Sequence, residues 1–201
     1  MILLFLFLQI LPNKEIFIYE TYEEAKVGTM HVVSEKDSLG YHIFYESDRT
    51  IDVILDSINL GTLFIHKIVK GDVELKISRG EKFNVWFKGF ERTYRDDRPI
   101  YDRHTLDFAF RGFHYTADFD TIIRLHVPEL MVINAHVKVV GEEVISTPFG
   151  DIPCWKVELT PRVFFIRTHI YFWFEKEYPH RFIKLEDDSG TKGIRVIGIK
   201  E

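Results

Sequence analysis

Two strands and the turn that joins them are encoded in residues 71–87, which read GDVELKISRGEKFNVWF. Apolar and polar side chains alternate with period two on both sides of residues 79–81. Successive side chains of a β-strand point to opposite faces of the sheet, so this pattern predicts two half-buried strands. Such a short turn joins antiparallel neighbours, because a parallel pair needs a long crossover.

The same alternation extends over most of the chain. Further strands are predicted at residues 41–46, 51–55, 63–69, 119–127, 130–140, 154–159, 164–174, 182–186 and 194–199. No helical stretch is long enough to supply the repeated crossovers of a parallel α/β fold. We therefore predict a mainly β protein with a single large curved antiparallel sheet, in the form of a half-barrel or open barrel.

One segment has helical rather than strand periodicity. Four apolar side chains are spaced i, i+3, i+4 and i+7, namely Leu106, Ala109, Phe110 and Phe113. This spacing places them on one face of a helix and predicts one short helix near residues 103–112, packed on the sheet. Asp102 or Thr105 is expected to cap it, since either side-chain oxygen can accept a hydrogen bond from a free amide of the first turn.

Composition limits the classes of function. The 201 residues are 46% hydrophobic and 15% aromatic, enough for one large β domain, which we place at residues 13–201. A net charge of -5 without a basic run argues against nucleic acid as a partner, because nucleic-acid affinity depends on concentrated Lys and Arg. The single cysteine, Cys154, cannot form an internal disulfide and is expected to be a small buried thiol.

The N-terminal residues form an apolar segment. Residues 2–8 are continuously apolar, and the run extends to Leu11 before Pro12 stops it. This is about half the roughly 20 residues that a membrane-spanning helix needs, and it matches the apolar region of a secretory signal. A basic leader and a small-residue cleavage site are missing, so a first strand is the alternative. We predict a signal or hydrophobic leader at residues 1–12 and a periplasmic or otherwise exported protein, and we leave a cytoplasmic location open.

The helical segment resembles part of a known bacterial family. Asp102, Thr105, Phe108 and Arg111 match, at the same spacing, the Asp, Ser or Thr, aromatic and Arg positions of a short helix in that family. The family belongs to the bacterial envelope and is called domain of unknown function 3108.

Two later motifs resemble the same family. Thr147-Pro148-Phe149-Gly150 is similar to its turn before a strand, and Trp173 followed by Pro179 is similar to its tryptophan strand and proline turn. The resemblance runs in order over roughly residues 28 to 199 and implies a signal-bearing protein whose sheet is similar to the half-barrel of bacterial lipoprotein carriers. The family has no established activity, so the resemblance implies no catalytic residues. This sequence departs from it in a shortened leader.

One cluster could support catalysis. Asp102, His104 and Asp107 lie beside Arg103 and Arg111, and a carboxylate near an imidazole can tune a general base. However, side chains two or three residues apart share a helix face only partly, and no nucleophile with an orienting partner is evident. The favoured interpretation is structural, with Asp102 as the cap and Arg111 paired with a carboxylate. We therefore predict no catalytic site and no enzyme activity.

The histidines do not predict a metal site. There are nine histidines, and the candidates for ligands are His114, His126, His136 and His169, all in strand-like regions. No spacing among them forces three ligands to meet. We predict no metal and no cofactor.

The predicted strand at residues 164–174 has two unlike faces. One is apolar, and the other consists of Arg167, His169, Tyr171 and Trp173. The second face is either the solvent side of the sheet or the mouth of a binding cleft. A cleft mouth would suit Tyr and Trp, because each has an apolar ring and a polar group that can reach water. The candidate ligand-binding residues are Phe87, Arg111, Arg167, His169, Tyr171 and Trp173.

These observations lead to two hypotheses of function. The first is a noncatalytic exported protein that binds an apolar molecule such as a lipid on the concave face of its sheet, between sheet and helix. Aromatic residues would supply apolar area, and Arg111, Arg167 or His169 would hold a polar head. The alternative is a structural or assembly module that pairs an exposed strand edge with an envelope protein partner.

Overall fold

A computed structural model of the protein describes residues 11–128, 131–163 and 168–200. In this part of the chain, strands form one large sheet in the order β8-β7-β6-β5-β4-β3-β2-β1-β15-β14-β13-β12-β11-β10-β9. The strands are β1 (Lys14–Glu23), β2 (Lys26–Lys36), β3 (Tyr41–Glu46), β4 (Arg49–Leu55), β5 (Thr62–Val69), β6 (Asp72–Arg79), β7 (Phe83–Phe87), β8 (Phe90–Tyr94), β9 (Ile100–Asp102), β10 (Asp120–Val127), β11 (Met131–Thr147), β12 (Gly150–Pro161), β13 (Ile170–Glu175), β14 (Phe182–Asp187) and β15 (Lys192–Lys200).

The predicted fold class, a mainly β chain with one large curved and open sheet, is confirmed. Neighbouring strands pair antiparallel along almost the whole sheet, and the hairpin predicted at residues 71–87 forms β6 and β7. Lys70 and Gly71 both have positive φ, 53° and 88°, which suits the two-residue turn of a twisted hairpin between β5 and β6. Two pairings depart from this meander. β1 pairs antiparallel with β15, which is distant in sequence, and β9 pairs with β10 in the parallel orientation.

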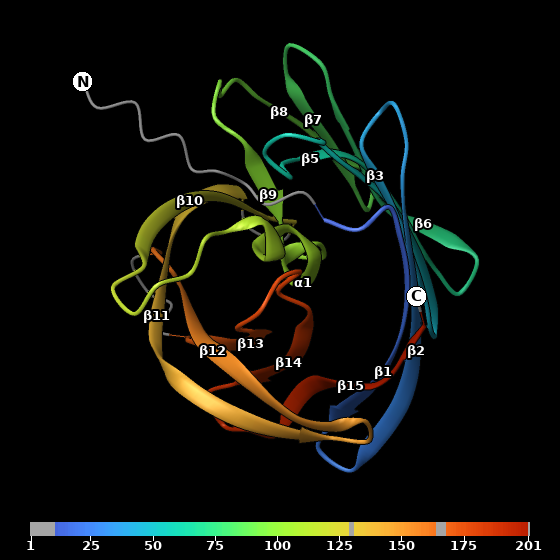
Figure 1. Ribbon diagram of the computed structural model, residues 1–201. Coiled ribbons are helices and arrows are strands. Elements are labelled where there is room, and N and C mark those ends of the chain that lie inside the picture. The colour runs from blue at the N-terminus through green and yellow to red at the C-terminus, as the bar shows by residue number, and fades with distance from the viewer. Residues whose placement is uncertain (1–10, 129–130, 164–167, 201) are drawn as a thin grey trace.

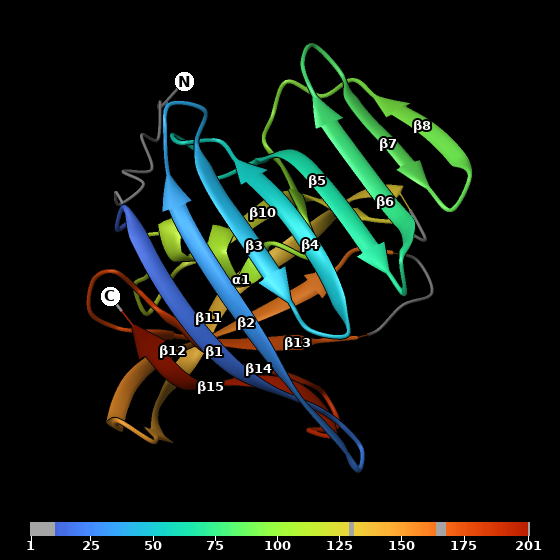
Figure 2. The same cartoon turned by 90° about the vertical axis from the view of Figure 1, so that its right-hand side faces the viewer.

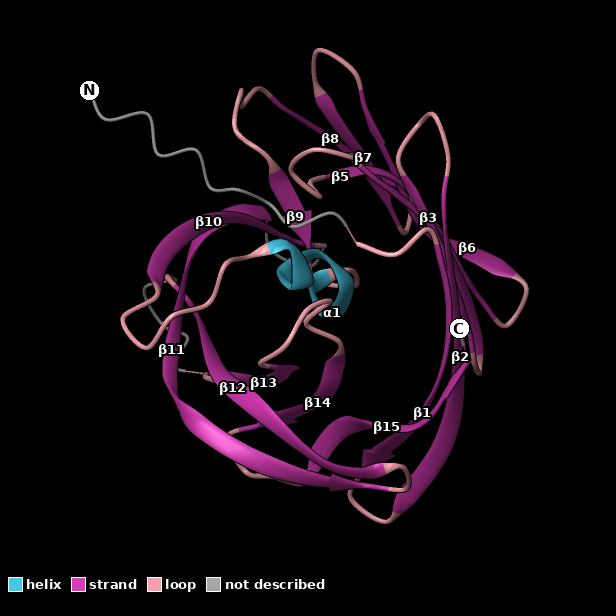
Figure 3. Cartoon of the chain, in the orientation of Figure 1, coloured by secondary structure: helices cyan, strands magenta, loops and turns pink. Residues whose placement is uncertain are grey.

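The sheet curls around a short helical segment (Figures 1 and 3). Strands β1 to β8 form one wall and β10 to β15 the opposite one, as the turned view shows (Figure 2). The edge strand β9 returns toward β5, where the Asp102 amide donates to Thr62 Oγ1 at 2.9 Å. The sheet nevertheless stays open, because β8 and β9 are its two ends and do not pair with each other.

The concave face carries the core, as the alternation predicted. Tyr41, Ile43 and Tyr45 of β3 are all buried there, opposite Leu55, Val53 and Ile51 of β4. Leu11 is also in the core, at 1% exposure, and its backbone bonds to the Tyr41 hydroxyl. The predicted leader therefore includes at least one core residue, while residues 1–10 lie outside the described part of the chain.

The helix is shorter than predicted. It consists of a single α-turn, α1 (Leu106–Ala109), followed by a 3-10 turn, η1 (Phe110–Gly112). The expected side-chain cap is wrong: the Thr105 hydroxyl donates to the Asp102 carbonyl at 2.9 Å, and the Asp102 carboxylate accepts from the His104 amide, two residues before the helix begins. None of the described helices is long and apolar enough to span a membrane.

The helical segment stays in place through aromatic packing. The Phe110 ring lies 5.4 Å from the Phe113 ring and 5.4 Å from the Phe172 ring of β13. Phe174 also contacts both Phe110 and Tyr115. Such offset and tilted ring pairs add to the stability that burial provides, so the segment fills much of the space inside the sheet.

Candidate functional site

A cleft of about 620 Å³ opens on the concave face, between the start of α1 and the sheet. Its walls come from β1, β2, the β3–β4 hairpin, β13, β14, β15 and residues 103–107. A volume of this size is typical of small-molecule sites. It lies where the sequence predicted a ligand, between sheet and helix.

Small side chains in the β-ladder create the cleft. Tyr19 on β1 fills the concave face, but two residues later Thr21 takes the equivalent position, with Gly28 and Ile194 opposite it. A Cβ atom at Gly28 would lie 3.0 Å from Thr21 Oγ1, so a larger side chain would crowd this row. The change from an aromatic to small residues leaves space that the neighbouring strands do not fill.

Apolar side chains form most of one wall. Leu185 and Ile194 are cross-strand partners on β14 and β15, and Met30 lies on the same face of β2. All three are half-buried, so they retain surface that faces the cleft. Phe172 and Ile51 lie behind them and are buried.

The helix end of the cleft, which consists of Tyr45, Arg103, His104 and Asp107, is polar. The Tyr45 hydroxyl donates to Asp107 Oδ1 at 3.0 Å. Burial raises the pKa of the Asp107 carboxyl to about 6, and the Tyr45 bond only partly offsets that rise. Burial, with the Asp107 charge beside it, also holds the pKa of the Tyr45 phenol well above its ordinary value. This pair places a weakly acidic carboxyl at the helix end.

A buried network around Asp102 supports the helix end. Asp102 Oδ1 lies 2.7 Å from His104 Nδ1, and Oδ2 lies 2.6 Å from His126 Nδ1. His104 Nε2 lies 3.2 Å from the Lys67 ammonium, which bonds to Glu74 at 2.6 Å. Burial opposes the charge of Asp102, but the two imidazoles outweigh it and hold the pKa of this carboxyl well below its ordinary value.

This network holds His104 in place and leaves it no free nitrogen. The carboxylate needs a proton on Nδ1, and the Lys67 ammonium needs a lone pair on Nε2, so the bonds assign one neutral tautomer to His104. A general base must accept a proton from its substrate within hydrogen-bond reach. Both nitrogens of this imidazole are already occupied. Among the described residues, no group of three or more His, Cys, Asp or Glu side chains could hold a metal ion.

Arg111 pairs with a carboxylate, as predicted, and that carboxylate belongs to Glu15. The two terminal nitrogens of Arg111 each lie 2.9 Å from one Glu15 carboxylate oxygen. The Arg111 side chain is 1% exposed and the Glu15 side chain 2%. The guanidinium also lies over the rings of Phe17 and Phe108, at 5.4 and 5.0 Å. Arg111 is buried and bonded to Glu15, and it is not part of the cleft wall.

Three other predicted ligand residues lie on the outer face of the sheet. Alternation along β13 turns Phe172 toward the cleft and turns Tyr171 and Trp173 the opposite way. The Trp173 ring is 2% exposed, because it lies between the Lys156 and Lys184 ammonium groups at 5.0 and 4.7 Å. His169, which precedes β13, stacks on Tyr171 at 6.5 Å. These three residues do not line the concave cleft, so their contact with a ligand stays a prediction.

The remaining two predicted residues have different outcomes. Phe87 lies at the end of β7, under the Lys88 ammonium at 5.2 Å, and is not part of the cleft wall. Arg167 lies outside the described residues. Ligand contact by Phe87 and by Arg167 therefore stays a prediction.

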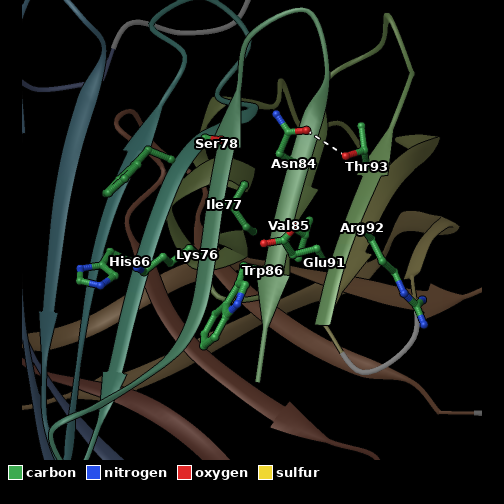
Figure 4. A pocket seen from close by; sticks show the side chains of 11 residues that line it. His66, Lys76, Ile77, Ser78, Asn84, Val85, Trp86, Glu91, Arg92 and Thr93 are labelled. Atoms are coloured by element: carbon green, nitrogen blue, oxygen red, sulfur yellow. Dashed lines mark hydrogen bonds between the residues drawn. The ribbon is translucent and has the colours of Figure 1, made fainter. Parts of the chain in front are cut away.

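A second hollow, of about 580 Å³, lies on strands β5 to β8 (Figure 4). One cross-strand row through it consists of Phe64, Ser78, Asn84 and Thr93, and Asn84 accepts a bond from Thr93 at 3.0 Å. Most of its side chains are polar or charged, and Trp86 is the main apolar surface. The concave cleft is the better candidate site because its wall is apolar and the sheet curves around it.

The sequence identifies the family. Residues 70–196 match a family described as "Protein of unknown function (DUF3108)". The chain belongs to DUF3108. The predicted resemblance is therefore confirmed over more than half of the sequence. DUF3108 has no stated activity in that description, and no curated protein matches this sequence.

One solved structure shares the fold of this DUF3108 protein, and two others are more distantly similar. A beta-barrel-like protein of domain of unknown function DUF1849 from Brucella abortus has a TM-score of 0.59 at 14% identity, covering 96% of this chain and 99% of that one. A predicted exported protein with a YmcC-like fold from Bacteroides fragilis scores 0.37 at 14% identity, over 97% and 99%. A predicted lipoprotein from Parabacteroides distasonis scores 0.35 at 11% identity, over 96% and 99%. Only the first similarity is close enough to support the fold, and it supports the fold alone.

Sequence reasoning missed most of the cleft. Its apolar wall, Met30, Leu185 and Ile194, comes from three strands that only the register brings together. The sequence places Asp107 in a possible catalytic cluster and not in a cleft, and it places Tyr45 only within the strand predicted at residues 41–46. The sequence signal that could have indicated a gap is Gly28, which interrupts the concave face of a strand otherwise rich in larger residues.

Proposed function

We propose that this protein binds an apolar or amphipathic molecule, such as a lipid, in the concave cleft and does not act on it chemically. The observation that supports this most is the apolar wall of Met30, Leu185 and Ile194, which keeps exposed surface inside a curved, otherwise well-packed sheet. Burial of apolar surface stabilises such a complex by about 0.8 kcal/mol for each CH₂ group taken out of water, before the costs of association.

A noncatalytic role is consistent with the chemistry of the described residues. Both nitrogens of His104, at the helix end of the cleft, are occupied. The Cys154 thiol is buried away from the cleft, and burial raises its pKa to about 12, so it is a poor nucleophile. We further propose that the protein is exported, which the apolar run at residues 2–8 supports.

The test compares two variants of β2 in binding assays. Met30→Asp puts a charge on the cleft wall, and Val33→Asp puts the same charge at a half-buried position on the opposite face of the same strand. We expect the first variant to weaken binding of a fluorescent apolar probe at least tenfold and the second to leave it within twofold, with thermal unfolding confirming that both fold. Equal probe binding by the two variants, together with no lipid in extracts of protein purified from its native host, would refute the proposal.

The second candidate function is strand pairing with an envelope protein partner. β8 is an edge of the sheet, and Phe90 at its start is 73% exposed, so its unpaired backbone could add a strand. However, Glu91 and Arg92 place charges on this edge, which is a common means of preventing pairing. A Phe90→Lys variant that lost a partner complex while still binding the apolar probe would favour this function over the first.

A further inference from the structure

Three carboxylates lie around the helical segment, and two of them are bonded to basic side chains. Glu15 receives both terminal nitrogens of Arg111 at 2.9 Å. Asp102 receives two imidazoles, from His104 and His126. Charges removed from water are costly unless an opposite charge or several hydrogen bonds compensate them, and these two sites follow that rule.

Asp107 has no such basic partner. Among the described residues, its side-chain partner is the neutral Tyr45 hydroxyl, and no Lys, Arg or His nitrogen lies within 4.0 Å of its carboxylate. The backbone amides of Asp107 and Phe108 help to stabilise the charge, and Arg111 acts on it at longer range while paired with Glu15. Asp107 is half-buried and faces the cleft.

The cationic groups of the cleft lie in a different environment. Lys26, Arg49, Arg103 and Lys192 line it, and all four are exposed to water. Arg49 pairs with Asp48 at 2.8 Å and Lys192 with Glu23 at 2.7 Å. Water screens exposed charges, so these cations act weakly on a molecule inside the cleft, whereas a half-buried carboxylate acts strongly.

We propose that the ligand carries an amine or other cationic head, which Asp107 holds at the helix end while the chain lies along Met30, Leu185 and Ile194. This inference rests on the proposed function, the binding of an amphipathic molecule in the cleft. An ammonium head gains a charge-assisted hydrogen bond to the carboxylate. A carboxylate head meets a like charge, and an alcohol gains only a neutral donor bond.

The test uses three amphiphiles with the same chain: dodecylamine, dodecanol and dodecanoate. Each displaces the apolar probe from the full chain at pH 8, below its micelle concentration, where Asp107 is ionised and the amine is protonated. We expect dodecylamine to bind about ten to a hundred times more tightly than dodecanoate, with dodecanol between them. Asp107→Asn should remove this preference, and Asp48→Asn, at an exposed carboxylate that lines the same cleft, should retain it.

The outcomes separate this inference from the function on which it rests. If all three amphiphiles bind equally, or if Asp107→Asn keeps the preference for the amine, the cleft binds chains but Asp107 does not select the head, and the inference fails alone. If none of the three binds, both proposals fail. Because Asp107→Asn removes an uncompensated charge and keeps an oxygen for Tyr45, it should fold, which its thermal unfolding checks.

Discussion

The Glu15–Arg111 pair offers the sharpest test of what stabilises the fold. The two side chains are bonded through both pairs of terminal atoms and are 2% and 1% exposed, so neither can reach water if its partner is removed. Glu15→Gln should leave a buried guanidinium without its counter-charge, at a cost of about 3 to 5 kcal/mol in free energy of unfolding. For a chain of this size, that corresponds to a fall of roughly 6 to 20 °C in Tm.

A double variant distinguishes the cost of an unpaired charge from the value of the pair. Glu15→Leu with Arg111→Met removes both charges and keeps apolar volume, so it should be clearly more stable than the sum of the two single changes predicts. Glu23→Gln serves as the control, because its pair with Lys192 is exposed and its loss should leave the free energy of unfolding nearly unchanged. Denaturant unfolding measures all of these variants. A loss below about 1 kcal/mol for Glu15→Gln, or strict additivity in the double variant, would refute the reasoning.

Two further predictions concern titratable groups. Burial raises the pKa of Asp107 from 3.8 to about 6. The stability that comes from its protonated form is therefore fully present below about pH 4, and this stability is lost as the pH rises through 6. Thermal unfolding should show that the free energy of unfolding of Asp107→Asn, relative to that of the natural protein, rises by about 1 to 2 kcal/mol between pH 4 and pH 7. The same difference at both pH values would contradict this assignment. Burial raises the pKa of the Cys154 thiol to about 12, so a thiol reagent at pH 8 should label it at least a hundred times more slowly in the folded chain than in denaturant. Comparable labelling rates in the two states would show that the thiol is not buried.

The strands were predictable where one face is apolar and the other is polar. That condition holds for β3, β4 and β6, whose burial alternates residue by residue. β8 lacks it, because its sequence FERTY is largely exposed at a sheet edge, and no strand was predicted there. The face of Trp173 was ambiguous for the opposite reason, since β13 is aromatic on both sides and its outer side is covered by lysine side chains.

The candidate site was less predictable because it depends on distant partners. Arg111 was expected to pair with a carboxylate, but Glu15 is 96 residues away in sequence. The cleft depends on the register that places Thr21 opposite Gly28 and Ile194, together with a bulge in the β1–β15 pair between Ile18 and Tyr19. No local pattern fixes such a register, because a shift of one residue would turn every side chain to the other face.

The β1–β15 seam gives the chain an unusual order of assembly. Of the strands that the structure describes, β1 is made before the others, yet one of the two strands that flank it, β15, is made after all of them. Until then, β1 exposes a free edge along residues 16–23, and the two walls of the sheet are linked only through the chain between them. Contacts between strands far apart in sequence slow folding, so the β1–β15 seam forms only after β15 has been made.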